Sequence, residues 1–446
     1  MMMNLSSTSR ACLFVSLLMA CVSNANDSDW HQWRGPHANG VSPKGNPPLK
    51  WSEEDNIKWK IAIDGDGIST PIVAGNKVFV LTTVITGKKD SSIPDPQNQP
   101  KTNFFDIKRP NQEHAYIVLC LDRSTGNELW RRTVFTKVPR EGTHNDNDFA
   151  SASPVTDGKF LFAWFGSAGL VCLDYQGKKI WDRDLGEVRV ESSLGEGCSP
   201  VLCNGKLIIL RDNAGQSLIY ALDSKTGKTI WVQKRNEKTA WATPLVVQRQ
   251  SQTQVITAAS KSIRSYDLDS GEVIWQCGGL TGNVIPCPVV LDGNVICMSG
   301  YQGYSALSIP LGLKGDITGS PEIGWTKSRG TPYIPSPLLY EDLLFYTQSN
   351  QPILTCVDGK TGEPIFGPKR IGQLSNLYAS PVGAANRIYF VGRKGKTVVL
   401  QKSKEFKVLA TNSLDDLFDA SPAIAGGQIF LRGKRHLYCI ESNNSD

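Results

Sequence analysis

The stretch SPVLCNGKLIILRDNAGQSLIYALDSKTGKTIW, residues 199–231, contains the pattern that decides the fold. A Pro suits the first residue of a strand, because no ladder hydrogen bond is lost there. Asn204-Gly205 is a favoured two-residue hairpin turn, since both residues tolerate positive φ. The run LIYALD predicts a third strand, and the Asp- and Gly-containing turn at residues 223–227 leads into a fourth strand with Trp231. The stretch therefore predicts four short antiparallel strands in succession.

The same unit recurs along the chain. A Ser-Pro-like dipeptide opens each unit, with one interval of 83 residues and later intervals of 41–49 residues. The dipeptides are Thr70-Pro71, Ser153-Pro154, Ser199-Pro200, Thr243-Pro244, Cys287-Pro288, Ser336-Pro337, Ser380-Pro381 and Ser421-Pro422. A period in the forties with several strands per unit is typical of a β-propeller. We therefore predict an all-β fold, an eight-bladed β-propeller of four-stranded antiparallel blades.

The two ends of the chain predict how the ring closes. The last unit stops at residues 439–441 without a fourth strand, whereas residues 56–61, around Trp59, form a strand pattern before the first dipeptide. We predict that this N-terminal strand completes the last blade, which leaves only short, protected sheet edges. The fourth strands also share a bulky residue, which we expect to pack between sheets. These residues are Trp130, Trp181, Trp231, Trp275, Trp325, Phe366 and Leu409.

The N-terminus predicts export. An apolar run at residues 11–20 is too short to span a bilayer and precedes Ser23-Asn24-Ala25, as in a secretory signal peptide. We expect residues 1–25 to be removed and the protein to lie in the periplasm or outside the cell. The alternative is lipidation at Cys21, because LMAC resembles a lipobox, and this would give an outer-membrane lipoprotein. No later segment is long and apolar enough for a membrane helix.

Two segments fall outside the repeat. Residues 26–50 form an N-terminal extension before the propeller at 51–446, and we expect its Trp30 and Trp33 to pack on the outside or the base of the ring. Residues 85–114 form a polar insertion in blade one. A structureless loop of this length is usually functional or disordered. The alternatives are a lid, a partner-binding arm or a tolerated surface insertion.

Charge and cysteine content exclude several functions. The net charge of +6 comes without a basic stripe interleaved with aromatic residues, so we expect no nucleic-acid partner. Cysteines recur at one repeat position, which indicates a small buried side chain. Cys287 and Cys297 flank a hairpin, and the sequence leaves open whether they pair. No CxxC motif or Cys/His cluster has metal-ligand spacing, so we expect no zinc or c-type haem.

The pattern ALDxxTGxxxW, from Ala221 to Trp231, resembles the PQQ-like propeller repeat. Related repeats occur in the assembly scaffold BamB and in quinoprotein dehydrogenases. The motifs WRGP (33–36), HNDNDFASASP (144–154) and RGKRHLYCIE (432–441) are similar to those of a secreted bacterial subgroup. The resemblance implies the fold, and the dehydrogenases imply PQQ with calcium as a cofactor. The chain lacks their vicinal cysteine pair and their recognisable calcium motif, so we expect no cofactor, no bound metal and no catalytic residues.

Propeller topology indicates where a ligand would bind. Loops that enter the first strands and loops that join strands two and three lie on one face, and polar and aromatic residues gather in them. We expect a binding site at this mouth of the channel, formed by His144, Asp146, Asp148, Glu196, Arg211, Trp241, Asn283, Tyr301, Tyr333, Asn376, Asp419 and Arg432. The first hypothesis is a monomeric, non-catalytic scaffold that binds a protein segment or a glycan. The second is an enzyme, either a PQQ-dependent oxidoreductase or another activity with its site at the channel mouth.

Overall fold

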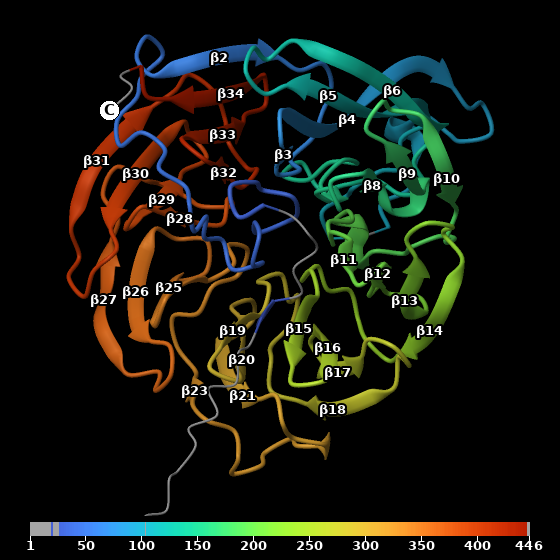
Figure 1. Ribbon diagram of the computed structural model, residues 1–446. Helices are drawn as coiled ribbons and strands as arrows, with labels where there is room; N and C mark the ends of the chain where they lie inside the picture. The colour runs from blue at the N-terminus through green and yellow to red at the C-terminus, as the bar shows by residue number, and fades with distance from the viewer. Residues whose placement is uncertain (1–18, 21–25, 103, 444–446) are drawn as a thin grey trace, which may run out of the picture.

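Figure 1 shows the computed structural model, in which eight antiparallel sheets surround a central channel as the blades of a propeller. The structure describes residues 19–20, 26–102 and 104–443. The predicted signal peptide, its predicted cleavage site at Ala25 and the alternative lipidation site at Cys21 fall outside the described residues, apart from β1 (Met19–Ala20). The predicted all-β, eight-bladed architecture is confirmed.

Each blade runs from an inner to an outer strand. Blade 1 contains β3 (Ile72–Ala74), β4 (Lys77–Lys89), β5 (Gln112–Asp122) and β6 (Glu128–Lys137). Blade 2 contains β7 (Val155–Thr156), β8 (Phe160–Trp164), β9 (Leu170–Asp174) and β10 (Lys179–Arg183). Blade 3 contains β11 (Val201–Cys203), β12 (Lys206–Arg211), β13 (Ser217–Asp223) and β14 (Thr229–Arg235). Blade 4 contains β15 (Leu245–Arg249), β16 (Gln252–Thr257), β17 (Ile263–Asp267) and β18 (Val273–Cys277).

The second half of the ring repeats this order. Blade 5 contains β19 (Val289–Leu291), β20 (Asn294–Ser299), β21 (Ser305–Pro310) and β23 (Thr326–Lys327). Blade 6 contains β24 (Leu338–Tyr340), β25 (Leu343–Thr347), β26 (Ile353–Asp358) and β27 (Pro364–Arg370). Blade 7 contains β28 (Val382–Ala384), β29 (Arg387–Val391), β30 (Lys396–Gln401) and β31 (Val408–Ser413). Blade 8 contains β32 (Ala423–Ala425), β33 (Gln428–Arg432), β34 (His436–Glu441) and β2 (Ile57–Ala62).

The remaining elements are short. β1 pairs with the inner strand β15, and β22 (Gly315–Asp316) pairs in parallel with the outer strand β18. Three 3-10 turns occur in the described residues, at η1 (Pro96–Asn98), η2 (Gly166–Ala168) and η3 (Glu191–Ser193). No helix in the described part of the chain has the length and apolar character needed to cross a bilayer.

The ring closes through the N-terminal strand, as predicted. β2 pairs antiparallel with β34, and Trp59 lies opposite Cys439. In Figure 1 the blue strand β2 therefore lies against the red strand β34, although they come from opposite ends of the chain. Because β2 completes blade 8, the described strands of blades 8 and 1 do not present unpaired edges to each other.

The bulky residues of the fourth strands join neighbouring blades. Trp181 of β10 donates its indole N–H to the carbonyl of Ser224 in the blade 3 turn (3.0 Å). The Gly227 of that turn has φ +68°, and a Cβ on it would lie 2.8 Å from the Trp181 ring. The same pairing joins Trp59 to Gly126, Trp130 to Gly177, Trp231 to Gly271 and Trp325 to Gly362. Turn Asp, turn Gly and strand Trp therefore form one repeated inter-blade joint.

The N-terminal extension crosses the base of the channel. Trp30 pairs with Val73 through backbone hydrogen bonds in both directions, and Ser42 N–H donates to the carbonyl of Gly383 across the ring. The buried guanidinium of Arg34 donates to the carbonyls of Pro337 and Pro381, each at 2.7 Å. This blue segment lies over the centre of the ring in Figure 1. The extension therefore ties together blades that are distant in sequence.

The insertion in blade one is shorter as a loop than its sequence suggested. β4 continues to Lys89 and β5 begins at Gln112, so both ends of the expected 85–114 segment belong to strands. β-Branched residues at 82–86 favour this extension of the hairpin. The loop proper is residues 90–111. Cys287 and Cys297, whose pairing the sequence left open, are both buried free thiols.

Candidate functional site

A ring of hydroxyl groups surrounds the channel. At six of the eight repeated Pro residues, the preceding Ser or Thr accepts, through its side-chain hydroxyl, a hydrogen bond from the backbone N–H of its counterpart in the preceding blade. Such bonds of 2.8–3.0 Å join Thr70 to Ser153, Ser153 to Ser199, Ser199 to Thr243, Cys287 to Ser336, Ser336 to Ser380 and Ser380 to Ser421. Thr70 Oγ1 donates to the carbonyl of Ser421 (3.0 Å), so that among the described residues such bonds link every neighbouring pair of blades except blades 4 and 5, where Cys287 replaces the Ser or Thr. The repeated Ser or Thr thus sets the spacing of the inner strands.

A cavity of about 400 Å³ lies at the centre of this ring. The loops that enter the first strands form much of its wall, and Trp33 of the extension contributes from the base. Trp33 also donates its indole N–H to Cys287 Sγ (3.1 Å), which fixes the ring. Seven of the predicted site residues line this central cavity: His144, Asp146, Trp241, Asn283, Tyr301, Tyr333 and Asp419.

Aromatic side chains dominate one part of the central cavity. Tyr301 and Tyr333 stack with their ring centroids 4.9 Å apart. Trp241 is held in place because its indole N–H donates to the carbonyl of Gly195 (2.7 Å). Phe105, from the insertion, meets His144 edge to face at 5.4 Å. Flat, partly exposed rings held in fixed orientations are suited to stacking against a ligand.

A charged cluster occupies another part of the wall. Arg393 donates to Asp146 Oδ1 (2.7 Å) and to Asp419 Oδ2 (3.0 Å), and its guanidinium lies 4.0 Å from the centre of the Tyr378 ring. Tyr378 O–H donates to Asp146 Oδ2 (2.9 Å). Burial raises the pKa of Asp146, but the hydrogen bonds from Arg393 and Tyr378 outweigh it, and the net shift is downward. Asp146 is therefore an ionised acceptor that is fully engaged with its neighbours.

A second cavity, the side chamber, adjoins the first. Its volume is about 230 Å³, and it shares Ile68, His144, Asn147 and Asp419 with the central cavity. Asp148 and Arg432, both predicted site residues, line the side chamber and not the central cavity. The predicted mouth thus consists of two adjoining spaces, the central cavity, which loops from around the whole ring surround, and the side chamber, which lies between the loops of blades 1, 2 and 8.

Three predicted residues lie elsewhere. Glu196 packs against Gly166 and accepts a hydrogen bond from Ser167 N–H (2.7 Å) in a separate narrow pocket. Burial raises the pKa of Glu196 to about 7. Asn376 Oδ1 accepts a hydrogen bond from Leu377 N–H (2.9 Å), and Asn376 lines neither the central cavity nor the side chamber.

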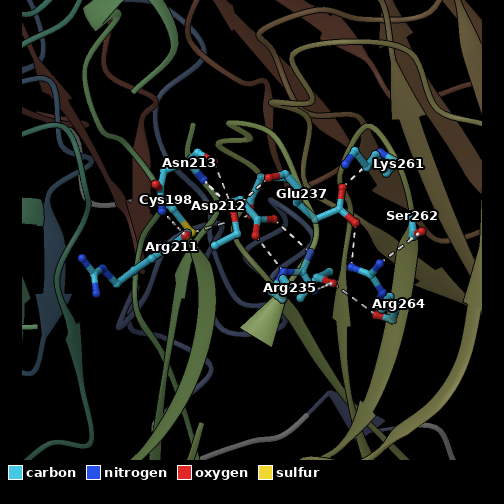
Figure 2. Close-up of polar contacts among 12 residues, drawn as sticks. Cys198, Arg211, Asp212, Asn213, Arg235, Glu237, Lys261, Ser262 and Arg264 are labelled. Carbon is cyan, nitrogen blue, oxygen red and sulfur yellow. Dashed lines mark hydrogen bonds and ion pairs between the residues drawn. The ribbon is translucent and has the colours of Figure 1, made fainter. Parts of the chain in front are cut away.

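Arg211 is the third of these residues. Its guanidinium donates to the carbonyls of Gly186 (3.0 Å) and Glu187 (2.8 Å) and supports a loop. Figure 2 shows Arg211 pointing away from its sequence neighbour Asp212. A guanidinium can bind backbone carbonyls as well as a ligand. The sequence alone does not show which of these two roles an Arg on a predicted site loop has.

Figure 2 also shows a charged network between blades 3 and 4, outside both cavities. Arg235 binds Asp212 through two parallel hydrogen bonds of 2.7 and 2.9 Å, and both side chains are fully buried. Arg264 binds Glu237 at 2.6 Å beside them. Because each charge has a partner, the network fixes how the two blades dock and leaves no charge free for a ligand.

Several functional residues were not identified from the sequence. Trp33 was expected on the outside or the base of the ring, and the sequence did not indicate that from the base its indole also lines the central cavity. Phe105 belongs to an insertion whose position no repeat pattern specifies. Arg393 was expected on the loop face, but its contacts with Asp146 and Asp419 were not. The WRGP motif, which begins with Trp33, marked this segment as distinctive, but nothing in the motif indicated that Trp33 would line the channel.

Within the described part of the chain, the central cavity has no lysine or arginine in its lining that could pair with the carboxylates of a quinone cofactor. PQQ carries three carboxylates, and the wall of the central cavity contributes two more, from Asp146 and Asp419. The nearby cation, Arg393, is already paired with both of these side chains. Among residues 19–20, 26–102 and 104–443, no group of three or more His, Cys, Asp or Glu is placed to hold a metal ion.

The closed ring of eight blades, with its Trp–Gly joints, defines the class of PQQ-like β-propellers. The family described as "Outer membrane protein assembly factor BamB" matches residues 114–367, and the chain belongs to this family. A BamB of *Francisella salina* is 30% identical over 122 residues, which span 27% of this chain and 21% of that protein. The match thus covers only a small part of that relative's length.

Solved structures share the fold at low sequence identity. BamB from *Moraxella catarrhalis* aligns with a TM-score of 0.55 at 12% identity, over 86% of this chain and 98% of that one. Quinohemoprotein alcohol dehydrogenase from *Comamonas testosteroni* aligns with a TM-score of 0.63 at 10% identity, over 95% of this chain and 82% of that one. Such similarity extends to scaffolds and to enzymes alike, so function has to be argued from the site.

Proposed function

We propose that this protein is an exported, non-catalytic binding propeller that engages a protein segment or a glycan through its loop face. The observation that carries the proposal is the central cavity, in which the stacked Tyr301–Tyr333 pair and Trp241 lie near the Arg393–Asp146 cluster. A concave, mostly apolar surface that includes aromatic rings and a few oriented polar groups is typical of a binding site.

The relatives support a scaffold in the cell envelope, because the family bears the name of an outer membrane protein assembly factor. We propose that the protein is a monomer in the periplasm or outside the cell, released by cleavage after Ala25. An outer-membrane lipoprotein anchored at Cys21 is the second form of this proposal. Mass spectrometry of the mature N-terminus distinguishes them, since a diacylglyceryl group on Cys21 would be found only in the second.

The rival function is an oxidoreductase, which the fold of the *Comamonas testosteroni* enzyme suggests. The charge of the central cavity opposes it, because the cofactor's carboxylates would meet Asp146 and Asp419. A titration with PQQ and Ca²⁺, followed by tryptophan fluorescence, should show no saturable change. Saturable, Ca²⁺-dependent quenching at micromolar concentrations would instead favour the oxidoreductase.

Arrays of immobilised peptides and oligosaccharides test the binding function with the whole mature protein. We expect specific binding to a subset of features and its loss in Tyr333→Ala, because this change removes half of the stacked pair. Tyr304→Ala is the matched control, since Tyr304 is near Tyr301 in sequence but does not line the central cavity. Binding that survives Tyr333→Ala, or no binding to either array, would contradict the proposal.

A further inference from the structure

We infer that the side chamber receives the hydroxyl groups of a neutral sugar residue, so that the ligand of this propeller is a neutral glycan. This inference rests on the proposed binding function and specifies its ligand class. It starts from Arg432, whose side chain is enclosed next to the central cavity.

Arg432 is a buried cation with unused donors. The residue is 2% exposed, and its Nε donates to the carbonyl of Gly67 (3.2 Å). Its two terminal nitrogens, Nη1 and Nη2, have no hydrogen-bond partner in the described structure, although Arg432 lines the side chamber. Leaving such donors unpaired is costly, so the geometry requires a polar occupant.

Acceptors line the same chamber. Asp148 uses Oδ1 to accept hydrogen bonds from Ala150 N–H (2.8 Å) and Ser151 O–H (3.2 Å). Asp66 is held at the wall because its backbone pairs with Thr83 in both directions. His114 Nδ1 lies 3.0 Å from the carbonyl of Gln112, and burial lowers the pKa of this ring, which makes Nε2 an acceptor.

The mixture of donors and acceptors selects against ions. A carboxylate or phosphate beside Arg432 and Lys434 would also meet Asp66, Asp148 and Asp419, whereas a cation would meet Arg432 and Lys434. A hydroxyl group can accept from a guanidinium and donate to a carboxylate at the same time. A neutral ligand with several adjacent hydroxyls can therefore pair with the donors of Arg432 and with the carboxylates beside it.

The neighbouring central cavity fits the rest of such a ligand. The two spaces meet at His144, Asn147 and Asp419. The rings of Trp241 and Tyr333 can stack against the apolar C–H face of a pyranose, while its hydroxyls point into the side chamber. A peptide would use the rings but would not supply adjacent hydroxyls to Arg432.

The test uses an array of neutral oligosaccharides, uronic-acid oligosaccharides and peptides, and calorimetry of the bound features as soluble ligands. We expect binding to neutral oligosaccharides, with an affinity about tenfold weaker in Arg432→Met and also weaker in Asp148→Asn. Arg435→Met is the matched control, because Arg435 lies in the same turn, pairs with Asp415 and does not line the side chamber. We expect its affinity to stay within about twofold of the parent.

The outcomes separate this inference from the proposed function. Binding only to uronic-acid features or only to peptides, with loss in Tyr333→Ala, would overturn the neutral glycan and leave the binding propeller intact. Unchanged affinity in both Arg432→Met and Asp148→Asn would show that the chamber holds water alone. No binding to any feature would contradict the proposed function itself. If Arg432→Met does not fold, Asp148→Asn and Arg432→Lys carry the same test.

Discussion

Single buried polar side chains make the stability of this chain depend on pH. Glu196 packs against Gly166, and burial raises its pKa to about 7. The folded state therefore holds this proton more tightly than the unfolded chain does. The stabilising effect of the protonated form is complete below the unfolded pKa near 4.5 and is lost as the pH rises through about 7.

Glu196→Gln should flatten this pH dependence. Between pH 4.5 and 7.5 we expect the parent to lose about 2–3 kcal/mol of unfolding free energy from this group, and the variant to lose less. Urea denaturation at a series of pH values measures the difference. Glu187→Gln, in a neighbouring exposed loop, controls for the loss of a negative charge. Parallel pH profiles for the parent and Glu196→Gln would contradict the proposed role of Glu196.

At the scale of elements, the blades are joined through their fourth strands. The turn glycine of one blade lies beneath the tryptophan of the preceding blade, and the indole donates to a carbonyl of the same turn. The exception is Trp275, whose indole N–H has no partner in the described structure. Blade 5 has no Asp-Gly turn at the corresponding place, because its chain continues to β22, which pairs with β18.

Gly227→Ala tests this joint. The new Cβ would lie 2.8 Å from the Trp181 ring at a φ of +68°, so the variant combines overpacking with backbone strain. Gly158→Ala is the matched control, since its φ is +87° and no atom lies within 4 Å of the new Cβ. We expect about 1–2 kcal/mol of destabilisation in the control and about 1–3 kcal/mol more in Gly227→Ala, measured by urea denaturation. Equal losses of unfolding free energy in Gly227→Ala and Gly158→Ala would show that only backbone strain matters and that the contact with Trp181 adds nothing.

At the scale of the whole molecule, the ring depends on its closing strand. β2 supplies the fourth strand of blade 8, and the Trp59 indole donates to the carbonyl of Arg123 in blade 1 (2.9 Å). One strand thus closes blade 8 and joins it to blade 1. The extension at the base adds further contacts across the ring, such as those of Arg34.

Deleting residues 51–63 should open blade 8. We expect loss of soluble expression or a large fall in melting temperature, because both edges of the ring become free. The milder Trp59→Ala should cost about 3–5 kcal/mol, whereas Lys58→Ala, at a partly exposed ion pair, should cost less than about 1 kcal/mol. A deletion that melts at the temperature of the parent would contradict closure by β2.

The repeat made most of the fold predictable, and the limits follow from its nature. The dipeptides and turn residues are local signals, so blade number, strand order and closure through Trp59 could be predicted. Contacts between distant segments have no local signal. For this reason Trp33 was not expected in the cavity, and Arg211 was expected there although it binds backbone carbonyls. The hydroxyl role of the repeated Ser appears only once neighbouring blades are placed side by side.

The central claim is that ligands bind in the loop-face cavity against Trp241. The direct measurement is tryptophan fluorescence of the whole mature protein, parent and Trp241→Phe, titrated with a soluble ligand from the arrays. The account predicts a saturable change in emission for the parent, at the affinity found by calorimetry, and a much smaller change for Trp241→Phe. An equal change in both proteins would show that the ligand does not bind against Trp241 and contradict the claim. Binding by calorimetry without any change in the parent would place the ligand away from both tryptophans of the central cavity, Trp33 and Trp241.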